Sequence, residues 1–328
     1  MRVLAGDIGG TKTRVGVFEV DGGDCRLVEE RSYPSRDYPG LGEIVADFVG
    51  SDGKDCRAAC FGIAGPVTGR RVHLTNLPWV VDADELEAQS GIPTVALLND
   101  LEATAWGVGA LDESQTAVLN PGRPDAAGNG VVIAAGTGLG EGGIFWNGEE
   151  SRPFACEGGH ASFSPADELG DRLLQFLRRS HGHVSWERVL SGPGLADLFR
   201  FMVSEAGEEE PDWFQEAEQT GDPVPAISEM ALEGRGEISV RTLELFARLY
   251  GEEAGNLALK VMATGGVWVG GGIAPRIRRF LEEGAFMDGF LAKGRMQPLL
   301  ESMPVRIILD DRAALFGAAR FAAATASS

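Results

Sequence analysis

The sequence predicts an α/β protein made of two domains of similar build. Strand-like apolar segments alternate with amphipathic helical segments along most of the 328 residues. A strand, a glycine-rich turn and a second strand occur at residues 3–20, and the same unit recurs at residues 129–147. The length suits two ordinary domains, and a cleft between two domains is the usual place for a ligand. We therefore expect two α/β domains with a ligand cleft between them.

The first domain is expected to begin with two strands that flank Gly9-Gly10-Thr11 and a third strand that follows a turn at Asp21-Gly22-Gly23. Continuous apolar character in the later strands is typical of a sheet covered on both faces. Asp82 or Asp84 is a suitable N-cap for a helix that ends before Gly91. The expected strands are 3–9, 13–20, about 25–32, 58–67 and 94–100, and the expected helices are 42–50, 82–91 and 101–111.

The second domain is expected to repeat the opening hairpin and then to become mostly helical. Residues 204–237 are acidic, interrupted by Pro and Gly and weakly periodic, so we interpret them as a surface excursion. The last helix follows a strand of the second copy and is expected to cross back onto the first domain, which gives domains of 1–110 plus about 303–328 and 111–302. The expected helices are 167–180, 192–207, 239–266, 274–284 and 311–326, and the later strands are 266–272 and 305–310.

The composition restricts partners and location. Lys and Arg number 29 against 49 Asp and Glu, so the net charge is −20, which argues against nucleic acid or an anionic membrane as a partner. A phosphate ligand must then be held locally, by backbone N–H groups and a metal ion. No apolar run is long enough for a membrane span, and a strand follows Met1 directly where a signal peptide would lie. The four cysteines form no disulfide framework, so we expect a cytoplasmic protein with reduced thiols.

The first glycine turn looks like a phosphate-binding loop but is not a P-loop. Lys12 follows Thr11 rather than Gly, and the next residues alternate as a strand instead of starting a helix. Glycines let backbone N–H groups approach an anion closely, so this hairpin is a candidate phosphate clamp. A tight hairpin with no ligand is the alternative. The candidate residues are Gly6, Asp7, Ile8, Gly9, Gly10 and Thr11.

A second candidate clamp is the turn Gly136-Thr137-Gly138-Leu139-Gly140. Gly138 to Gly143 also match G-x-G-x-x-G, but a strand follows where a dinucleotide site needs a helix. A third glycine run, which includes Gly271 and Gly272, ends a strand of the second half. Two such turns facing each other could hold a polyphosphate from both sides.

Two carboxylates lie at strand ends, where open α/β sheets bind their ligands. Asp7 comes just before the first glycine turn and could hold Mg²⁺ through a bound water. Asp100 follows Asn99 at the end of the strand 94–100 and could accept the proton of a substrate hydroxyl. The alternative is that Asp100 caps the following helix.

Further candidates combine carboxylate, imidazole and exposed backbone, which suits a polyhydroxyl ligand. Glu157 and His160 flank two glycines, and Glu187 is expected in the first turn of a short helix with Ser185 as its N-cap. A structural histidine and a surface glutamate are the alternatives for His160 and Glu187. His181 and His183 are poor candidates for a metal pair because no further Cys or His cluster follows.

Six motifs together resemble the bacterial glucokinases, which belong to the actin-like/hexokinase ATPase superfamily. The resemblance extends from Val3 to about Phe321. The motifs, in order, are "GDIGGTKT", "LLNDLEATAWG", "AAGTGLGEG", "EGGHASFSP", "ERVLSGPGL" and "GGVWVGGGIAPR".

The resemblance implies two actin-like (ribonuclease H-like) domains with mixed sheets flanked by helices. It implies transfer of phosphate from ATP, with Mg²⁺, to the 6-hydroxyl of glucose, with Asp100 as the general base. It further implies sugar contacts from Asn99, Asp100, Glu157, His160 and Glu187. The ATP phosphates would lie at Gly6–Thr11 and Gly136–Gly140, and adenosine near Gly271 and Gly272. The family likeness also leads us to expect a homodimer.

The sequence departs from this family at Lys12, where many members have Asn, and "GGTK" and "LTNLPW" are similar to a related family of sugar kinases and repressors. That family usually has a zinc site just after the His, but no Cys follows residue 156 here, so we expect no zinc. Its repressors also carry an N-terminal DNA-binding helical domain, whereas this chain begins on its first strand. The alternatives that stay open are a kinase for mannose, fructose or an N-acetylated sugar, and a sugar-sensing regulator without catalysis.

Overall fold

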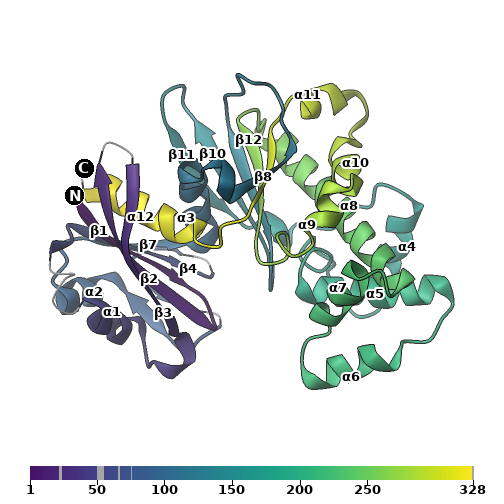
Figure 1. Cartoon of the computed structure of the whole chain (residues 1–328), viewed down its shortest axis with the longest axis horizontal. Coiled ribbons are helices and arrows are strands. Elements are labelled where there is room, and N and C mark those ends of the chain that lie inside the picture. The colour runs from purple at the N-terminus through teal and green to yellow at the C-terminus, as the bar shows by residue number, and fades with distance from the viewer. Residues whose placement is uncertain (22–23, 50–54, 66, 75, 327–328) are drawn as a thin grey trace. The chain divides into compact units, whose positions relative to one another are not determined.

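A computed structural model describes residues 1–21, 24–49, 55–65, 67–74 and 76–326. The chain forms two compact units. The first contains Met1–Gln115, Arg152–Ala155 and Asp310–Ser328, and the second contains Thr116–Ser151 and Cys156–Leu309. Each unit has a sheet flanked by helices, which confirms the predicted α/β class (Figure 1).

The sheet of the first unit is mixed, with the strand order β3-β2-β1-β4-β7. The first three strands form antiparallel pairs, whereas β1, β4 and β7 run parallel to one another. The structure adds a small antiparallel pair, β5 with β6, that was not predicted. The strands are β1 Arg2–Ile8, β2 Lys12–Asp21, β3 Asp24–Pro34, β4 Ala58–Ile63, β5 Arg71–His73, β6 Val80–Asp82 and β7 Val95–Asn99.

Helices cover both faces of this sheet. Successive residues of β1 point to opposite sides, and the apolar residues on each side pack against helices. Leu4 packs in one cluster with residues of α1 (Leu41–Val49) and α2 (Ala83–Ser90), whereas Val3 and Ala5 pack with α3 (Asp100–Gly107) and α12 (Ala313–Ala326). The small residues of α12 allow a close approach to α3 (Figure 1). A Cβ on Gly317 would lie only 1.7 Å from the backbone oxygen of Ala103.

The second sheet repeats this strand order, and its edge strand β11 contains Arg152–Ala155, the segment grouped with the first unit. Its order is β11-β10-β9-β12-β13-β8, in which β9 and β10 are antiparallel while β9, β12 and β13 are parallel. The strand β8 adds an antiparallel edge. The strands are β8 Thr116–Asn120, β9 Gly130–Ala135, β10 Leu139–Trp146, β11 Ser151–Cys156, β12 Gly266–Gly270 and β13 Val305–Ile308.

Long and short helices pack on the second sheet around one large apolar core. The central helix is α8, whose buried residues include Leu243, Phe246 and Tyr250. The predicted helix 274–284 is shorter, and two unpredicted helices follow it. The helices of this core are α4 Glu168–Leu177, α5 Gly192–Ala206, α8 Glu237–Val261, α9 Arg278–Glu282, α10 Ala285–Leu291 and α11 Gln297–Glu301.

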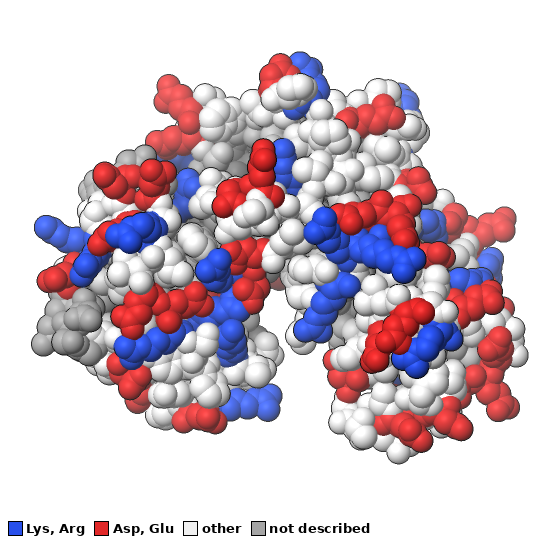
Figure 2. Space-filling view, in the orientation of Figure 1, with Lys and Arg blue, Asp and Glu red and all other residues white. Residues whose placement is uncertain are grey.

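The prediction of a surface excursion at 204–237 needs correction, because this segment forms two packed helices, α6 (Asp212–Thr220) and α7 (Val224–Leu232). Phe214 and Ile227 are fully buried, and the Phe214 ring stacks on Phe199 of α5 with 4.7 Å between ring centroids. Acidic side chains are frequent over this part of the unit in Figure 2. Each helix is short and has few buried residues, so its apolar side was hidden in the sequence.

The position of β13 shifts one expected boundary. The first unit takes up the chain again at Asp310 rather than at about 303, because β13 pairs with β12 and β8 in the second sheet. None of the helices in the described part of the chain combines the length and apolar character that a membrane-spanning helix requires.

Candidate active site

The first glycine turn joins β1 to β2, as the sequence predicts. The N–H of Gly9 donates to the backbone oxygen of Lys12 at 3.0 Å and closes the hairpin. Ser35, which the sequence did not single out, holds the turn from the side. The Ser35 hydroxyl donates to the backbone oxygen of Gly9 at 2.8 Å and lies 2.9 Å from the hydroxyl of Thr13. The Ser35 N–H donates to the backbone oxygen of Thr11 at 3.0 Å.

Glycine is required in this turn for space rather than for a left-handed backbone. Neither Gly9 nor Gly10 has a positive φ. A Cβ on Gly10 would lie 2.9 Å from the Cβ of Asn76, and one on Gly9 would lie 2.9 Å from the oxygen of Lys12. A side chain at either position would therefore shift the turn.

Asp7 and Asp100 lie at the carboxyl ends of parallel strands. Asp7 is opposite Gly62 in β4, and Ile63 is opposite Asn99 in β7. The pKa of Asp7 is raised to about 6, first by desolvation and then by the charge of Asp100, while Arg14 acts in the opposite direction. Gly62 of β4 lies between the two strand ends, and the charge of Asp100 raises the pKa of Asp7.

Asn99, and not Asp100, is the N-cap of α3. The Asn99 Oδ1 accepts hydrogen bonds from the N–H groups of Leu101 at 2.9 Å and Glu102 at 3.3 Å, and its Nδ2 donates to Gly65 at 3.0 Å. Asp100 is the first helical residue, and its Oδ1 also accepts from Leu101 at 2.9 Å. The alternative role for Asp100, that of helix cap, is therefore filled by Asn99.

The second glycine turn, Gly136-Thr137-Gly138, joins β9 to β10, and Leu139 and Gly140 already belong to β10. The N–H of Gly136 donates to the backbone oxygen of Gly138 at 2.8 Å. The backbone oxygen of Gly136 accepts a hydrogen bond from the N–H of Gly192, the first residue of α5, at 2.8 Å. Neither Gly136 nor Gly138 has a positive φ. A Cβ on Gly138 would lie 2.4 Å from the Oε2 of Glu187.

His160 lies between the two predicted glutamates. Its Nε2 is 3.9 Å from the Oε2 of Glu157, and its Nδ1 is 3.9 Å from the Oε1 of Glu187. The side chains of His160 and Glu157 are more than half exposed, and that of Glu187 is 31% exposed. The three residues thus present a carboxylate, an imidazole and a second carboxylate to solvent.

Two chain segments pair to hold this group. The N–H groups of Trp186 and Glu187 donate to Ala161 at 3.0 Å and Gly159 at 2.9 Å, and the N–H of Phe163 donates to Val184 at 2.9 Å. The predicted short helix at Glu187 is a single turn, in which Arg188 donates to the Ser185 oxygen at 3.1 Å. Pairing with residues 159–163 takes the place of a continued helix.

Both histidines of the His181-Gly182-His183 motif have partners within the protein. The Nε2 of His181 lies 3.0 Å from Asp197 of α5, and the Nε2 of His183 lies 3.1 Å from the backbone oxygen of His160. Within the described residues, no group of three or more His, Cys, Asp or Glu side chains could hold a metal ion. His183 instead supports the backbone of the exposed group.

Gly271 follows β12 with a φ of +80°, which favours glycine. A Cβ there would also lie 2.2 Å from the oxygen of Ala135, the last residue of β9. A Cβ on Gly136 would lie 4.0 Å from the nitrogen of Gly272, so the second and third glycine runs are neighbours.

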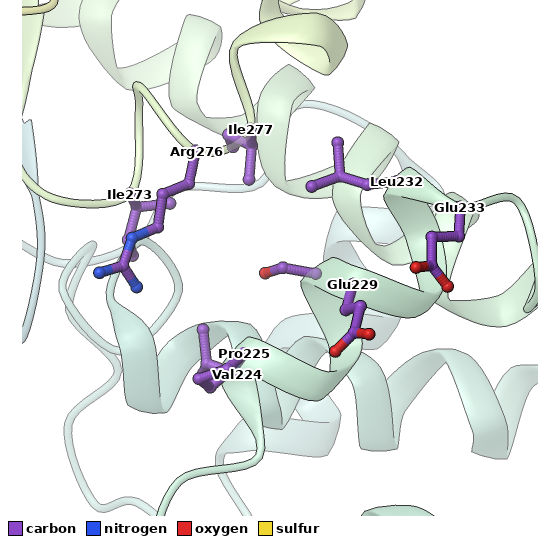
Figure 3. Close-up of a pocket in the computed structure, with 9 residues that line it drawn as sticks. Val224, Pro225, Glu229, Leu232, Glu233, Ile273, Arg276 and Ile277 are labelled. Carbon is purple, nitrogen blue, oxygen red and sulfur yellow. The ribbon is translucent and has the colours of Figure 1, made fainter.

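A cavity of about 460 Å³ begins directly after Gly272. Figure 3 shows Ile273, Arg276 and Ile277 on one side and residues of α7 on the other. Most of its walls are apolar, with Arg276, Glu229 and Glu233 as charged groups. The lining residues are Val224, Pro225, Ser228, Glu229, Leu232, Glu233, Ile273, Arg276 and Ile277. Residues of the acidic segment 204–237, for which the sequence predicted no function, thus form one wall of a cavity beside the second and third glycine runs.

Glu141 of β10 is a buried carboxylate that the sequence did not single out. It is 2% exposed, and within the described chain its Oε1 has no hydrogen-bond partner. Its pKa is raised to about 8, first by burial and then by Glu253, against the opposing charge of Lys260. A Cβ on Gly158 would lie 1.9 Å from its Oε2, so Glu141 packs beneath the loop of Glu157 and His160.

Comparison with known proteins identifies the family. Residues 4–325 match the model of the family described as Glucokinase. The chain belongs to the glucokinase family. It is 41% identical over 336 residues to the glucokinase of Nostoc punctiforme, with 98% of each chain covered.

Solved structures of glucokinases share the fold. The crystal structure of the glucokinase from an Antarctic psychrotroph is 32% identical, with a TM-score of 0.87 over 98% of this chain and 99% of that one. A ROK family glucokinase from Streptomyces griseus, crystallised with glucose and AMPPNP, is 24% identical, with a TM-score of 0.66 over 99% of this chain and 100% of that one. The predicted resemblance to the bacterial glucokinases is therefore confirmed.

Proposed function

We propose that this glucokinase transfers the γ-phosphoryl group of ATP to the 6-hydroxyl of glucose, with Asp100 as the general base. The observation that carries this assignment is the place of Asp100 at the carboxyl end of β7, beside Asp7 and the first glycine turn. Ligands of open α/β sheets bind at this edge, and transfer to an alcohol needs a carboxylate that takes its proton.

Asn99 prepares Asp100 for this role. Asn99 caps α3, so Asp100 lies in the first turn of the helix at the carboxyl end of β7, where its carboxylate is proposed to meet the substrate hydroxyl. The second hydrogen on Nδ2 of Asn99 could be donated to a sugar oxygen.

Glu157, His160 and Glu187 are proposed to complete the sugar site. Two carboxylates accept hydrogen bonds from hydroxyl groups, and the imidazole can donate or accept, which matches the alternating needs of a hexose. The two residue pairs, each 3.9 Å apart, leave each group able to turn to a ligand. The pairing of residues 159–163 with 184–187 sets their spacing before the sugar binds.

The glycine runs and the cavity are proposed to bind ATP. The N–H groups of Gly10, Thr11, Thr137 and Gly138 would approach the phosphates, whereas those of Gly9 and Gly136 close the two turns. The cavity beyond Gly271 and Gly272 has apolar walls, and its volume suits the adenosine part. The AMPPNP bound by the Streptomyces griseus enzyme supports ATP as the phosphoryl donor.

Mg²⁺ fits Asp7 as one partner among several. Asp7 is close enough to Asp100 for their charges to repel, and a divalent cation would relieve this repulsion. Among the described residues no cluster of three or more ligands forms, and Mg²⁺ needs few protein ligands because it keeps several waters and takes phosphate oxygens. Bound there, the ion would neutralise charge on the β- and γ-phosphates. Asp7 would hold it through water.

A coupled assay over a panel of sugars and phosphoryl donors tests this proposal. We expect turnover with glucose and ATP to exceed that with mannose, fructose, an N-acetylated sugar, ADP or polyphosphate. Asp100→Asn should keep the fold and lower kcat by about 10²–10⁴. Sugar binding without turnover of any sugar would instead indicate a regulator.

We also propose that the protein is a homodimer in the cytoplasm.

A further inference from the structure

Tyr250 of α8 is a fully buried tyrosine whose hydroxyl reaches the end of the second sheet. Its oxygen accepts a hydrogen bond from the N–H of Ala135 at 3.0 Å and lies 3.0 Å from the oxygen of Ile133 and 3.1 Å from that of Gly270. Ile133 and Ala135 lie at the end of β9, and Gly270 is the last residue of β12. One side-chain atom therefore joins the ends of two neighbouring strands.

The backbone that leaves these two ends forms the proposed nucleotide loops. Gly136 follows Ala135, and Gly271 follows Gly270. The oxygen of Ala135 accepts from the N–H of Ile273 at 3.2 Å, and Ile273 lines the cavity. Gly271 passes so close to Ala135 that a Cβ would lie 2.2 Å from its oxygen. Ala135 is thus the common support of the turn at 136–138, the run at 271–272 and the cavity wall.

The tyrosine itself is held firmly. Its ring makes edge-to-face contacts with Phe246 and Phe286, whose ring centroids are 5.9 and 5.8 Å away. Burial raises the pKa of Tyr250 well above its usual value, so the hydroxyl keeps its single proton, which it donates to the oxygen of Ile133 or to that of Gly270. A well-packed ring gives this hydroxyl one fixed position.

We propose that Tyr250 is a positioning residue for the nucleotide, which sets the spacing of the two glycine loops through Ala135 and Gly270. This role rests on the proposed function of the loops. Tyr250 touches three backbone groups and acts through them. Without its hydroxyl, the N–H of Ala135 would lose its partner in a buried place, and the strand ends would rearrange at the point where the loops begin.

Tyr250→Phe tests the proposal because it removes the hydroxyl and keeps the ring. We expect the KM for ATP to rise about 10-fold, the scale of one lost buried hydrogen-bond partner. The KM for glucose should stay within about 2-fold, because the sugar groups bond elsewhere. Thr242→Val is the matched control, since it removes a buried hydroxyl of the same helix that donates to the backbone oxygen of Ile238 within α8. It should leave both KM values unchanged.

Two measurements separate the possible failures. Hydrogen exchange at the Ala135 amide should become faster in Tyr250→Phe and not in Thr242→Val. Calorimetry with Mg²⁺ and AMPPNP should show weaker binding to Tyr250→Phe than to the unaltered protein. If the unaltered protein binds no nucleotide, the proposed function is wrong. If both proteins bind it equally, or if both KM values rise together with falling Tm, the positioning role alone is overturned.

Discussion

The carboxylate of Glu187 accepts a hydrogen bond of 3.0 Å from the backbone N–H of Leu139, the first residue after the second glycine turn. The other oxygen of the same carboxylate lies 3.9 Å from the Nδ1 of His160. One side chain therefore contacts both a proposed sugar residue and the strand that carries a proposed phosphate loop.

This double contact predicts that Glu187→Ala will weaken both substrates. Loss of the charged acceptor should raise the KM values for glucose and ATP by about 10-fold each, because hydrogen bonds to charged groups contribute about 1.5–3 kcal/mol. Glu187→Gln keeps an oxygen acceptor for Leu139 and should spare ATP more than glucose. Steady-state kinetics on both variants decide the matter, and an effect on glucose alone would exclude the link to the turn.

The crowding at Gly10 predicts a selective loss in Gly10→Val. The new side chain would meet Asn76 and displace the turn, so nucleotide use should suffer far more than sugar binding. Calorimetry with glucose beside ATP kinetics, on protein shown to be folded, measures the two effects. Equal weakening of both ligands, in proportion to lost stability, would indicate a purely structural hairpin.

The environment of Asp7 predicts a magnesium requirement. Activity should need Mg²⁺ and survive a zinc-selective chelator. Asp7→Asn should raise the Mg²⁺ concentration needed for half-maximal activity, because the amide carries no charge to hold the ion. Titration of Mg²⁺ at fixed ATP measures this shift. Stoichiometric zinc that is lost together with activity would contradict the prediction.

The raised pKa of Glu141 predicts a pH-dependent stability. Its pKa is about 8 in the folded protein against 4.5 ordinarily, so between these values the folded state binds more protons than the unfolded state. The contribution of Glu141 to the free energy of unfolding therefore falls as the pH rises from about 4.5 to about 8. Glu141→Gln should remove this fall.

Chemical denaturation across that pH window measures the difference between the two proteins. The advantage of Glu141→Gln should grow with pH, by at most about 1.4 kcal/mol per pH unit. Glu149→Gln, a change at an exposed position, is the control and should follow the unaltered protein. Parallel curves for all three proteins would show that Glu141 titrates normally.

Met262 predicts a stabilising substitution. It ends α8 in the left-handed region, with a φ of 54°, and is 51% exposed. A side chain in this conformation costs about 1–2 kcal/mol, whereas glycine adopts it readily. Met262→Gly should therefore raise Tm by a few degrees without changing kinetics, as calorimetry can check. A lower Tm would mean that the methionine side chain contributes more than the strain costs.

The regular parts of the fold were predictable because they follow simple patterns. Both hairpins, the buried strands and α12 stand out by alternation, apolar runs and small residues. The helices α6 and α7 were missed because Pro and acidic residues hide the few apolar positions that pack, such as Phe214. The short strands β5 and β6 have only three residues each, too few for a period to show.

The candidate site was predictable where the chemistry resides in nearby residues. His160 and Glu157 are close in sequence, and Glu187 begins the motif "ERVLSGPGL". The supports were missed because they come from remote positions: Ser35 reaches the first turn, and Tyr250 reaches β9 from 115 residues away. A buried hydroxyl or carboxylate has no sequence period, and only the fold shows which backbone group it meets.

The return of α12 to the first unit has a consequence for protein synthesis. Leu315, Ala318, Ala319 and Ala322 are fully buried against one face of the first sheet, beside Val3 and Ala5 of β1. The first strands made by the ribosome therefore wait for the last helix, whereas the second unit has all its residues once Leu309 is made. Nascent chains usually fold from the N-terminus onward, but here the N-terminal unit is completed last. Until α12 has been made, the first unit exposes an apolar face that a chaperone could cover.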